Sequence, residues 1–249
     1  MGLVAIIGGT GLSQIDGFKI TETRSVATPY GDPSHHFEIG RYADHPIVFL
    51  ARHGNPHHIP PHMINYRANL WALKDLGVES IIAVNAVGGI RTDLQLAEVV
   101  ICDQIIDYTA GREHTFFEDR IEHIDFTFPY DPDLCQQLAA AARQLSASMQ
   151  EFRFSATGVY GCTQGPRLET AAEIRRLSAD GCDVVGMTGM PEASLAAELG
   201  IRYSGLSLVI NKAAGLDNQS ISLDQLQAVL DEGMGRIVEL LKIALKTLA

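Results

Sequence analysis

The stretch SLVINKAAG, residues 207–215, joins an apolar run to a polar end, and this combination indicates the class of the fold. Residues 207–210 have the pattern of a buried strand, and that strand ends at an amide, Asn211. Continuous apolar runs bounded by glycine are typical of a sheet that is covered on both faces. Comparable runs rich in Val and Ile occur at 3–7, 46–50, 80–84, 99–106, 156–161, 183–186 and 203–210.

Helical patterns lie between several of these predicted strands. They occur near 61–77, 131–149, 169–180 and 191–199, and a last helix begins at a capping box formed by Ser222 and Gln225. Strands that alternate with helices predict an α/β fold with a largely parallel or mixed sheet. No linker, repeat or low-complexity tract interrupts the 249 residues, so we expect one domain over 1–249.

Composition limits the classes of partner. The formal net charge of −11 argues against a nucleic-acid or anionic-membrane surface, although a small anion needs only local donors. The sequence has no signal segment and no apolar run of membrane-spanning length. The four cysteines are scattered without a C-x-x-C pair, which fits a reduced, cytoplasmic setting.

Ligands of α/β sheets bind at the carboxyl ends of strands, so the residues that follow each strand are the candidates. The segment 8–11 is Gly-Gly-Thr-Gly, which lacks the dinucleotide and P-loop patterns and is either a tight turn or a phosphate loop. Arg52 and His53 follow the next strand and are either oxyanion donors or a solvated surface pair. The donors at four strand ends together predict one oxyanion site, expected to hold phosphate, made of Thr10, Arg52, His53, Asn85, Ala86 and Thr188.

Two further residues are candidates for the organic part of a ligand. Asn211 ends the strand at 207–210, and Glu169 either faces the ligand or caps the helix near 169–180 through the helix dipole. A zinc site at the histidines between 53 and 62 is disfavoured, because three prolines break helical spacing and no H-E-x-x-H pattern is present. These histidines are expected in a substrate-contacting loop or a plain surface loop.

Several motifs resemble those of the trimeric purine nucleoside phosphorylases and methylthioadenosine phosphorylases, in order and at matching intervals over about residues 3–245. The motifs are IIGGTGL, ARHG, NYRANLWALK, NAVGG, CTQGPRLET, GMTGMPEASLA and INKAAG. The resemblance implies a single α/β domain with a distorted mixed sheet flanked by helices, and a homotrimer. It implies a pentosyltransferase of purine salvage that uses inorganic phosphate as co-substrate, without a metal or an organic cofactor.

The same resemblance assigns roles to residues. It implies the phosphate site described above, with Arg52, His53 and Asn211 as the catalytic residues. Met187 would line the ribose, His57 would lie near the junction of phosphate and ribose, and His123 would reach a neighbouring subunit's site. The base would meet Asn211, Lys212 and Ala213, with Glu169 at its edge.

Three positions distinguish subclasses within this family. Adenine-specific members have aspartates at the positions of Asn211 and Ala213 and a serine at that of Glu169, whereas 6-oxopurine members have Asn and Glu. A carboxylate accepts from N1–H of a 6-oxopurine but opposes N1 of adenine, which is itself an acceptor. Leu223 stands where ordinary members place a histidine for the 5′-hydroxyl, and Leu226 follows one turn on; such an aliphatic wall suits a methylthio group.

We therefore expect cleavage of 5′-methylthioinosine by phosphate to hypoxanthine and 5-methylthioribose 1-phosphate. A broad inosine/guanosine phosphorylase is the main alternative, and a methylthioadenosine phosphorylase fits less well. A non-catalytic nucleoside sensor is the alternative of another class, although a sensor would not need the whole phosphate set. Leu168, where relatives carry an aromatic residue, is a departure that concerns base stacking.

Overall fold

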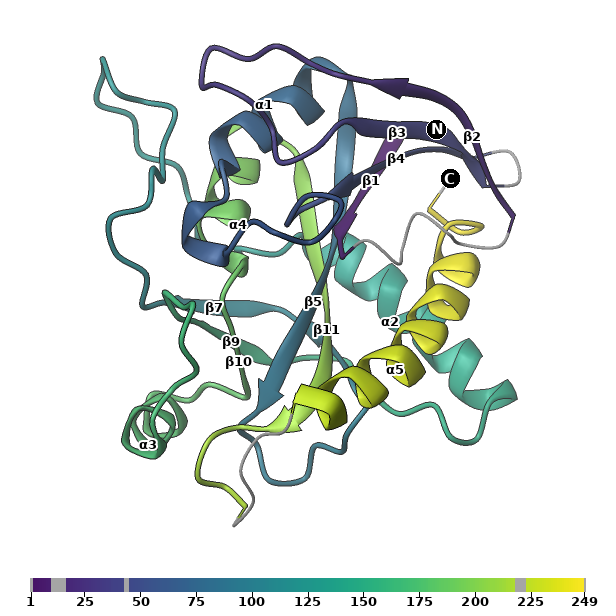
Figure 1. Ribbon diagram of the computed structural model, residues 1–249. Coiled ribbons are helices and arrows are strands. Elements are labelled where there is room, and N and C mark those ends of the chain that lie inside the picture. Colours follow the sequence, from purple (N-terminus) through teal and green to yellow (C-terminus); the bar gives the residue numbers. More distant parts are fainter. Residues whose placement is uncertain (1, 10–16, 43–44, 218–222, 249) are drawn as a thin grey trace.

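The structure is a computed structural model that describes residues 2–9, 17–42, 45–217 and 223–248, without the side chains of 223–225. One mixed sheet runs through it and helices flank both sides (Figure 1), which confirms the predicted α/β class. Thr10 and Ser222, the first residue of the predicted capping box, lie outside the described residues.

The sheet has eleven strands. Their bounds are β1 Leu3–Gly8, β2 Phe18–Arg24, β3 Phe37–Tyr42, β4 His45–Ala51, β5 Val78–Gly89, β6 Val99–Cys102, β7 Gln104–Asp107, β8 Phe154–Ser155, β9 Val159–Cys162, β10 Val184–Gly186 and β11 Arg202–Lys212. The order is β2-β3-β4-β1-β5-β10-β9-β7, and β11, β6 and β8 continue from β5 as a branch. Both parallel and antiparallel pairs occur, so the sheet is mixed as expected.

Strand β5 is the centre of the branch, because three strands pair with it. The parallel partner β11 occupies one edge from Ser80 to Gly89. On the other edge β1 pairs as far as Ala83, and the antiparallel β10 pairs only with Gly88 and Gly89. No described strand pairs with residues 84–87 on that edge, so the sheet opens there.

Five α-helices are described, with bounds α1 Tyr66–Asp75, α2 Pro132–Ser148, α3 Ala171–Ala179, α4 Gly189–Glu198 and α5 Leu223–Ala244. Helices α2 and α5 pack together beside β11, and α1 and α4 pack together on the other side of the sheet (Figure 1). Asn65 caps α1 and Asp131 caps α2 by accepting a backbone N–H with the side chain, as Asn and Asp commonly do. No helix within the described ranges is long and apolar enough to cross a membrane.

Two parts of the fold differ from the sequence prediction. Strands β2 and β3 were not predicted, because β2 is exposed along six of its seven residues and has no apolar run. The predicted strand 99–106 is divided into β6 and β7, which pair with different partners, β11 and β9. Neither difference moves a strand end that carries a candidate residue.

Candidate active site

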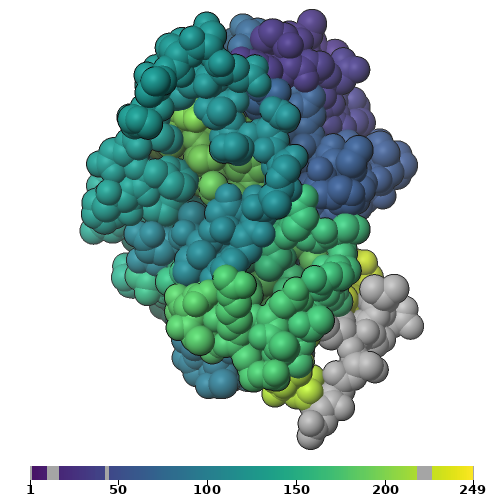
Figure 2. All heavy atoms as spheres, turned by 90° about the vertical axis from the view of Figure 1, so that its left-hand side faces the viewer, coloured from purple at the N-terminus to yellow at the C-terminus, as the bar shows by residue number. Residues whose placement is uncertain are grey.

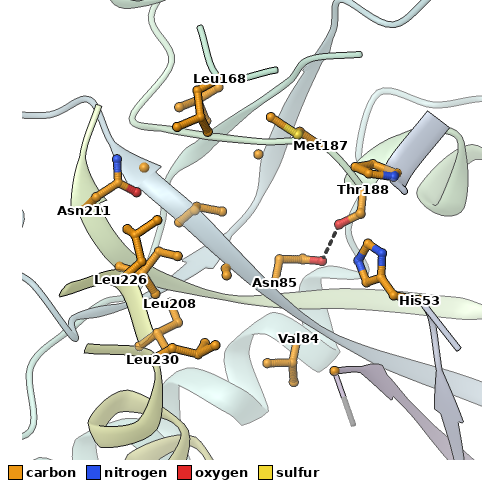
Figure 3. A pocket seen from close by; sticks show the side chains of 18 of the residues that line it. His53, Val84, Asn85, Leu168, Met187, Thr188, Leu208, Asn211, Leu226 and Leu230 are labelled. Carbon is orange, nitrogen blue, oxygen red and sulfur yellow. Dashed lines mark hydrogen bonds between the residues drawn. The ribbon is translucent and has the colours of Figure 1, made fainter. Parts of the chain in front are cut away.

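A pocket of about 880 Å³ lies where the sheet opens beside β5. It is surrounded by the carboxyl ends of β1, β4 and β10, by residues 84–87 of β5, by the end of β11 and by one face of α5. Ten of the residues that line it are labelled in Figure 3. Its position at strand ends is the position that the sequence predicted for a ligand site.

One part of this pocket, called the donor end, is formed by Arg52, His53, Asn85, Ala86 and Thr188. The Thr188 hydroxyl donates to Asn85 Oδ1 over 3.0 Å, and both side chains are almost fully buried. This bond fixes the orientation of the amide, and among the described residues it leaves the two Nδ2–H donors of Asn85 for a ligand. Figure 3 shows the bond, with His53 beside it.

Arg52 is more constrained than the sequence suggested. Its Nε and Nη2 donate to the two carboxylate oxygens of Glu192 over 2.7 and 2.9 Å, and Nη1 donates to the carbonyl of Val84. A weaker Nη2 bond reaches the Ile7 carbonyl, so four of the five donors have partners in the described part of the chain and one Nη1–H remains. Burial opposes the charge of Arg52, but Glu192 outweighs burial and raises the pKa of Arg52 above its ordinary value.

Glu192 was not predicted as part of the site. It is fully buried in α4 and also accepts the hydroxyl of Tyr203, which lies in β11. Glu192 holds Arg52 in place. Removing Glu192 would be strongly destabilising, because it would leave the buried charge of Arg52 uncompensated. The available sequence signal was a single acid within the apolar run GMPEASLA.

His53 is held in one tautomer by the backbone. Its Nδ1 lies 2.8 Å from the carbonyl oxygen of Ile59. Because a carbonyl can only accept, Nδ1 carries the hydrogen and Nε2 of the neutral ring is an acceptor. Burial, and then the charge of Arg52, lower the pKa of His53 to about 4, so the ring is neutral near pH 7. His57 stacks on this ring at 4.3 Å and also lines the pocket.

The opposite part of the pocket, called the amide–carboxylate end, is formed by Leu168, Glu169, Asn211 and Ala213. Glu169 Oε1 accepts the hydroxyl of Thr163 over 2.6 Å, and the only hydrogen bond of this carboxylate within the described ranges is that one. The helix cap that Glu169 might have supplied comes instead from Thr170, which forms a capping box with Glu173 in α3. Glu169 is therefore available to a ligand.

Asn211 faces the pocket because the pairing of β11 with β5 shifts register between Val209 and Asn211. Its Nδ2 donates to the carbonyl of Lys212 over 2.7 Å, which leaves one N–H and the Oδ1 acceptor. The side chain of Lys212, which was predicted to meet the base, does not line the pocket. Side chains alternate along a strand, and the Lys212 ammonium lies on the carbonyls of Thr92 and Leu94 outside the pocket.

The third wall is mainly apolar, although Gln227 and Asp231 of α5 also line the pocket. Leu208 of β11 and Leu226, Leu230 and Met234 of α5 line it below the amide–carboxylate end (Figure 3). Of the two predicted aliphatic residues, Leu226 lies in this wall, and the side chain of Leu223 is not among those that the structure describes. Half-exposed Leu168 covers the opposite side of the same end.

The remaining predicted residues are divided between the pocket and the surface. Met187 lines the pocket beside Thr188, and a Cβ on Gly165 would lie 2.5 Å from its sulfur, so the two segments need the glycine, which has φ +61°. His123 is exposed on the 108–131 loop and does not line the pocket of its own chain. Within the described ranges, no cluster of three His, Cys, Asp or Glu side chains could hold a metal.

Known proteins resemble this chain over most of its length. The family model described as the phosphorylase superfamily matches residues 3–246. A probable S-methyl-5′-thioinosine phosphorylase of Pseudomonas syringae pv. tomato is 51% identical, with 95% of this chain and 96% of that relative covered. The 6-oxopurine nucleoside phosphorylase of Pyrococcus furiosus is 42% identical, with 97% and 91% covered.

A solved structure has the same fold over the full length of this chain. The methylthioadenosine phosphorylase of Schistosoma mansoni, in complex with adenine, superposes with a TM-score of 0.93 at 33% identity. All of this chain and 92% of that chain are covered.

Proposed function

We propose that this chain, which belongs to the phosphorylase superfamily, cleaves S-methyl-5′-thioinosine with inorganic phosphate. The products are hypoxanthine and 5-methylthioribose 1-phosphate, so the enzyme is a pentosyltransferase. The observation that carries the proposal is that one pocket has anion donors at one end and the Glu169–Asn211 pair at the other.

Phosphate is assigned to the donor end. Asn85 donates its Nδ2–H groups to the phosphate, and Arg52 donates its remaining Nη1–H. The backbone peptide group at Ala86 is a further polar contact. His53 Nε2 accepts the single hydroxyl of HPO₄²⁻, because Nδ1 is already the donor to Ile59. Thr10 is proposed as a further hydroxyl donor on the ground of the family resemblance.

The base is assigned to the amide–carboxylate end. Glu169 accepts from N1–H of a 6-oxopurine, and Asn211 donates its free N–H to O6 or N7. Adenine would place its N1 acceptor against the Glu169 carboxylate, with no hydrogen between them. Leu168 and Ala213 would pack on the base faces.

The sugar is assigned to the region between the two ends, beside Met187 and His57. Its 5′ substituent points to the apolar wall of Leu226 and Leu230. Burying a methylthio group against these leucines is worth about 1–3 kcal/mol, and a hydroxyl would not gain this apolar contact. This difference supports a methylthio substrate over an ordinary nucleoside.

The reaction needs no external reductant or oxidant. A phosphate oxygen forms the bond to the anomeric carbon as the C1′–N9 bond breaks, and its electron pair passes to the purine. Asn211 stabilises the negative charge of the departing base. The hydroxyl proton of HPO₄²⁻ is released through His53, and the purine takes up one proton from solvent, so the proton count balances. We propose that the enzyme uses no metal or organic cofactor.

We also propose a cytoplasmic homotrimer in which His123 of one copy reaches the pocket of the next. The exposed position of His123 on the 108–131 loop is compatible with this role. Activity that disappears at concentrations where sedimentation shows monomer supports the proposal. A fully active monomer contradicts it.

A broad 6-oxopurine nucleoside phosphorylase is the second candidate, favoured by the Pyrococcus furiosus relative. The two functions share the base site and differ at the apolar wall. The deciding measurement is kcat/KM for methylthioinosine, inosine, guanosine and methylthioadenosine, with and without phosphate. Methylthioinosine is expected to be the best substrate, and hypoxanthine release is expected to require phosphate. Release that ignores phosphate, or binding without turnover, contradicts a phosphorylase.

A further inference from the structure

Arg112 is a buried cation that the proposed reaction does not use. It lies on the 108–131 loop between β7 and α2 and is 8% exposed. It does not line the pocket. Figure 2 shows teal atoms of this loop crossing one face of the molecule, above light green atoms of the α4 region.

The hydrogen bonds of Arg112 connect segments that are far apart in the sequence. Nη2 donates to the carbonyl of Gln164 over 2.8 Å and more weakly to that of Thr163, and Nε donates to the Gln164 side chain. Nη1 donates to the carbonyl of Met187 over 2.9 Å and also to that of Met190. The same group reaches the hydroxyl of Tyr66 in α1, and the guanidinium lies over that ring.

Arg112 differs from Arg52 in its partners. Arg52 is neutralised by a carboxylate, whereas the acceptors around Arg112 are carbonyl, amide and hydroxyl oxygens. Within the described chain no Asp or Glu lies within ion-pair distance of Arg112. A buried charge is costly unless its donors are satisfied, so these oxygens are held firmly around the guanidinium.

The two segments that Arg112 joins support opposite ends of the pocket. Thr163, whose carbonyl accepts from Arg112, donates its hydroxyl to Glu169. Met187 precedes Thr188, whose hydroxyl orients Asn85. A carbonyl fixed at Met187 also fixes the orientation of the peptide that leads into Thr188.

We propose that Arg112 is a positioning residue that sets Glu169 and the Thr188–Asn85 pair in one geometry. The choice of substrates for its kinetic test rests on the proposed function. The positioning of the two segments by Arg112 does not depend on that function. Five donors in a planar fork are required to reach both segments, and a lysine has three donors on one nitrogen. The conservative change Arg112→Lys therefore keeps the charge and loses the connection.

The test compares Arg112→Lys with Arg67→Gln. Arg67 anchors the same loop through the carbonyl of Thr115 and the carboxylates of Glu113 and Glu118, but it contacts neither segment at the pocket. We expect Arg112→Lys to raise the KM for phosphate about tenfold and to lower the preference for methylthioinosine over methylthioadenosine about tenfold. Arg67→Gln should change neither quantity. The proposal is overturned if both quantities keep their wild-type values in Arg112→Lys, or if Arg67→Gln shows the same shifts as Arg112→Lys.

A second variant separates positioning from general stability. Thr163→Val removes the hydroxyl bond to Glu169 but keeps the backbone carbonyl that Arg112 holds. It should lower the base preference and leave the KM for phosphate unchanged. An unchanged base preference in this variant overturns the part of the proposal that acts through Glu169. The Thr163→Val test remains decisive even if Arg112→Lys does not fold.

Hydrogen exchange gives a readout that is independent of catalysis. Arg112→Lys should lose amide protection in the two segments 163–169 and 187–190 together, and Arg67→Gln should lose it in neither. If wild type fails to cleave any nucleoside, the proposed function fails while this result still decides the role of Arg112. A fall in Tm without loss of protection in these segments indicates a merely structural arginine and overturns the proposal.

Discussion

The two ends of the pocket are built differently. At the donor end, Arg52, Asn85 and Thr188 are buried within or just after strands and bond to one another or to backbone and Glu192. At the amide–carboxylate end, Glu169 and Asn211 are only partly buried, and each side chain bonds to a neighbour close in sequence. The donor end is thus part of the core, whereas the amide–carboxylate end is carried by side chains that can be exchanged.

This difference has a consequence for mutation. Changes at the donor end should reduce stability together with turnover, because its polar groups are the partners of other buried groups. Changes at the amide–carboxylate end should alter which base is accepted and leave the free energy of unfolding nearly unchanged. Four experiments can break or sharpen this contrast, and they follow in order of decreasing expected effect.

The largest effect is expected for Glu192→Gln. The variant leaves the buried Arg52 without its counter-charge and should lower the free energy of unfolding by about 3–5 kcal/mol. Urea denaturation measures the loss, and Glu198→Gln on the same helix, whose carboxylate accepts from the backbone of Phe116, is the control with a cost below about 1 kcal/mol. Equal losses in the two variants would show that the donor end is not integrated into the core.

The double change Asn211→Asp with Glu169→Ser should shift the ratio of kcat/KM for methylthioinosine over methylthioadenosine by about 10²-fold toward adenine, or about 3 kcal/mol. The single changes should each give less, and their effects should not add, because both residues contact one base. The unfolding free energy should stay within about 1 kcal/mol of wild type. A ratio that stays at the wild-type value in the double variant removes these two residues from base recognition.

The third test uses the pKa of His53. The folded protein holds this pKa at about 4, below the ordinary value of 6.5, so only the unfolded chain gains the proton as the pH falls between these values. Stability from His53 is therefore complete above about pH 6.5 and is lost toward pH 4, with an amplitude of about 3 kcal/mol. The stability difference between wild type and His53→Gln should shrink or reverse over this window, and parallel curves would contradict the assignment.

The smallest effect is expected at the apolar wall. Leu226→Ser should reduce the preference for methylthioinosine over inosine about tenfold, because the methylthio group loses apolar contact and the hydroxyl gains a polar partner. Leu96→Ser, a change of an exposed leucine that does not line the pocket, is the control and should not move the ratio. A Leu226 variant with the wild-type ratio would place the 5′ group elsewhere in the pocket.

Much of the fold was predictable from the sequence, because apolar runs such as 207–210 mark buried strands and the donors follow directly. The exposed β2 gave no such signal, since its stability depends on pairing with β3 rather than on burial of an apolar run. The pairing of Arg52 with Glu192 spans 140 residues, and local patterns contain no information on such distant partners. Lys212 was misplaced because a single run of letters does not show which side of a bulged strand each residue occupies.

The gap on the edge of β5 between β1 and β10 arises from backbone pairing, not from small side chains. A pocket formed in this way persists when the side chains around it are replaced, because no side-chain substitution adds a strand to the open edge of β5. Side chains that line the pocket can therefore be replaced without changing the strand pairing that forms it. The backbone pairing forms the pocket, and the side chains around it determine which ligand binds. The scaffold is therefore a suitable starting point for engineering other nucleoside preferences.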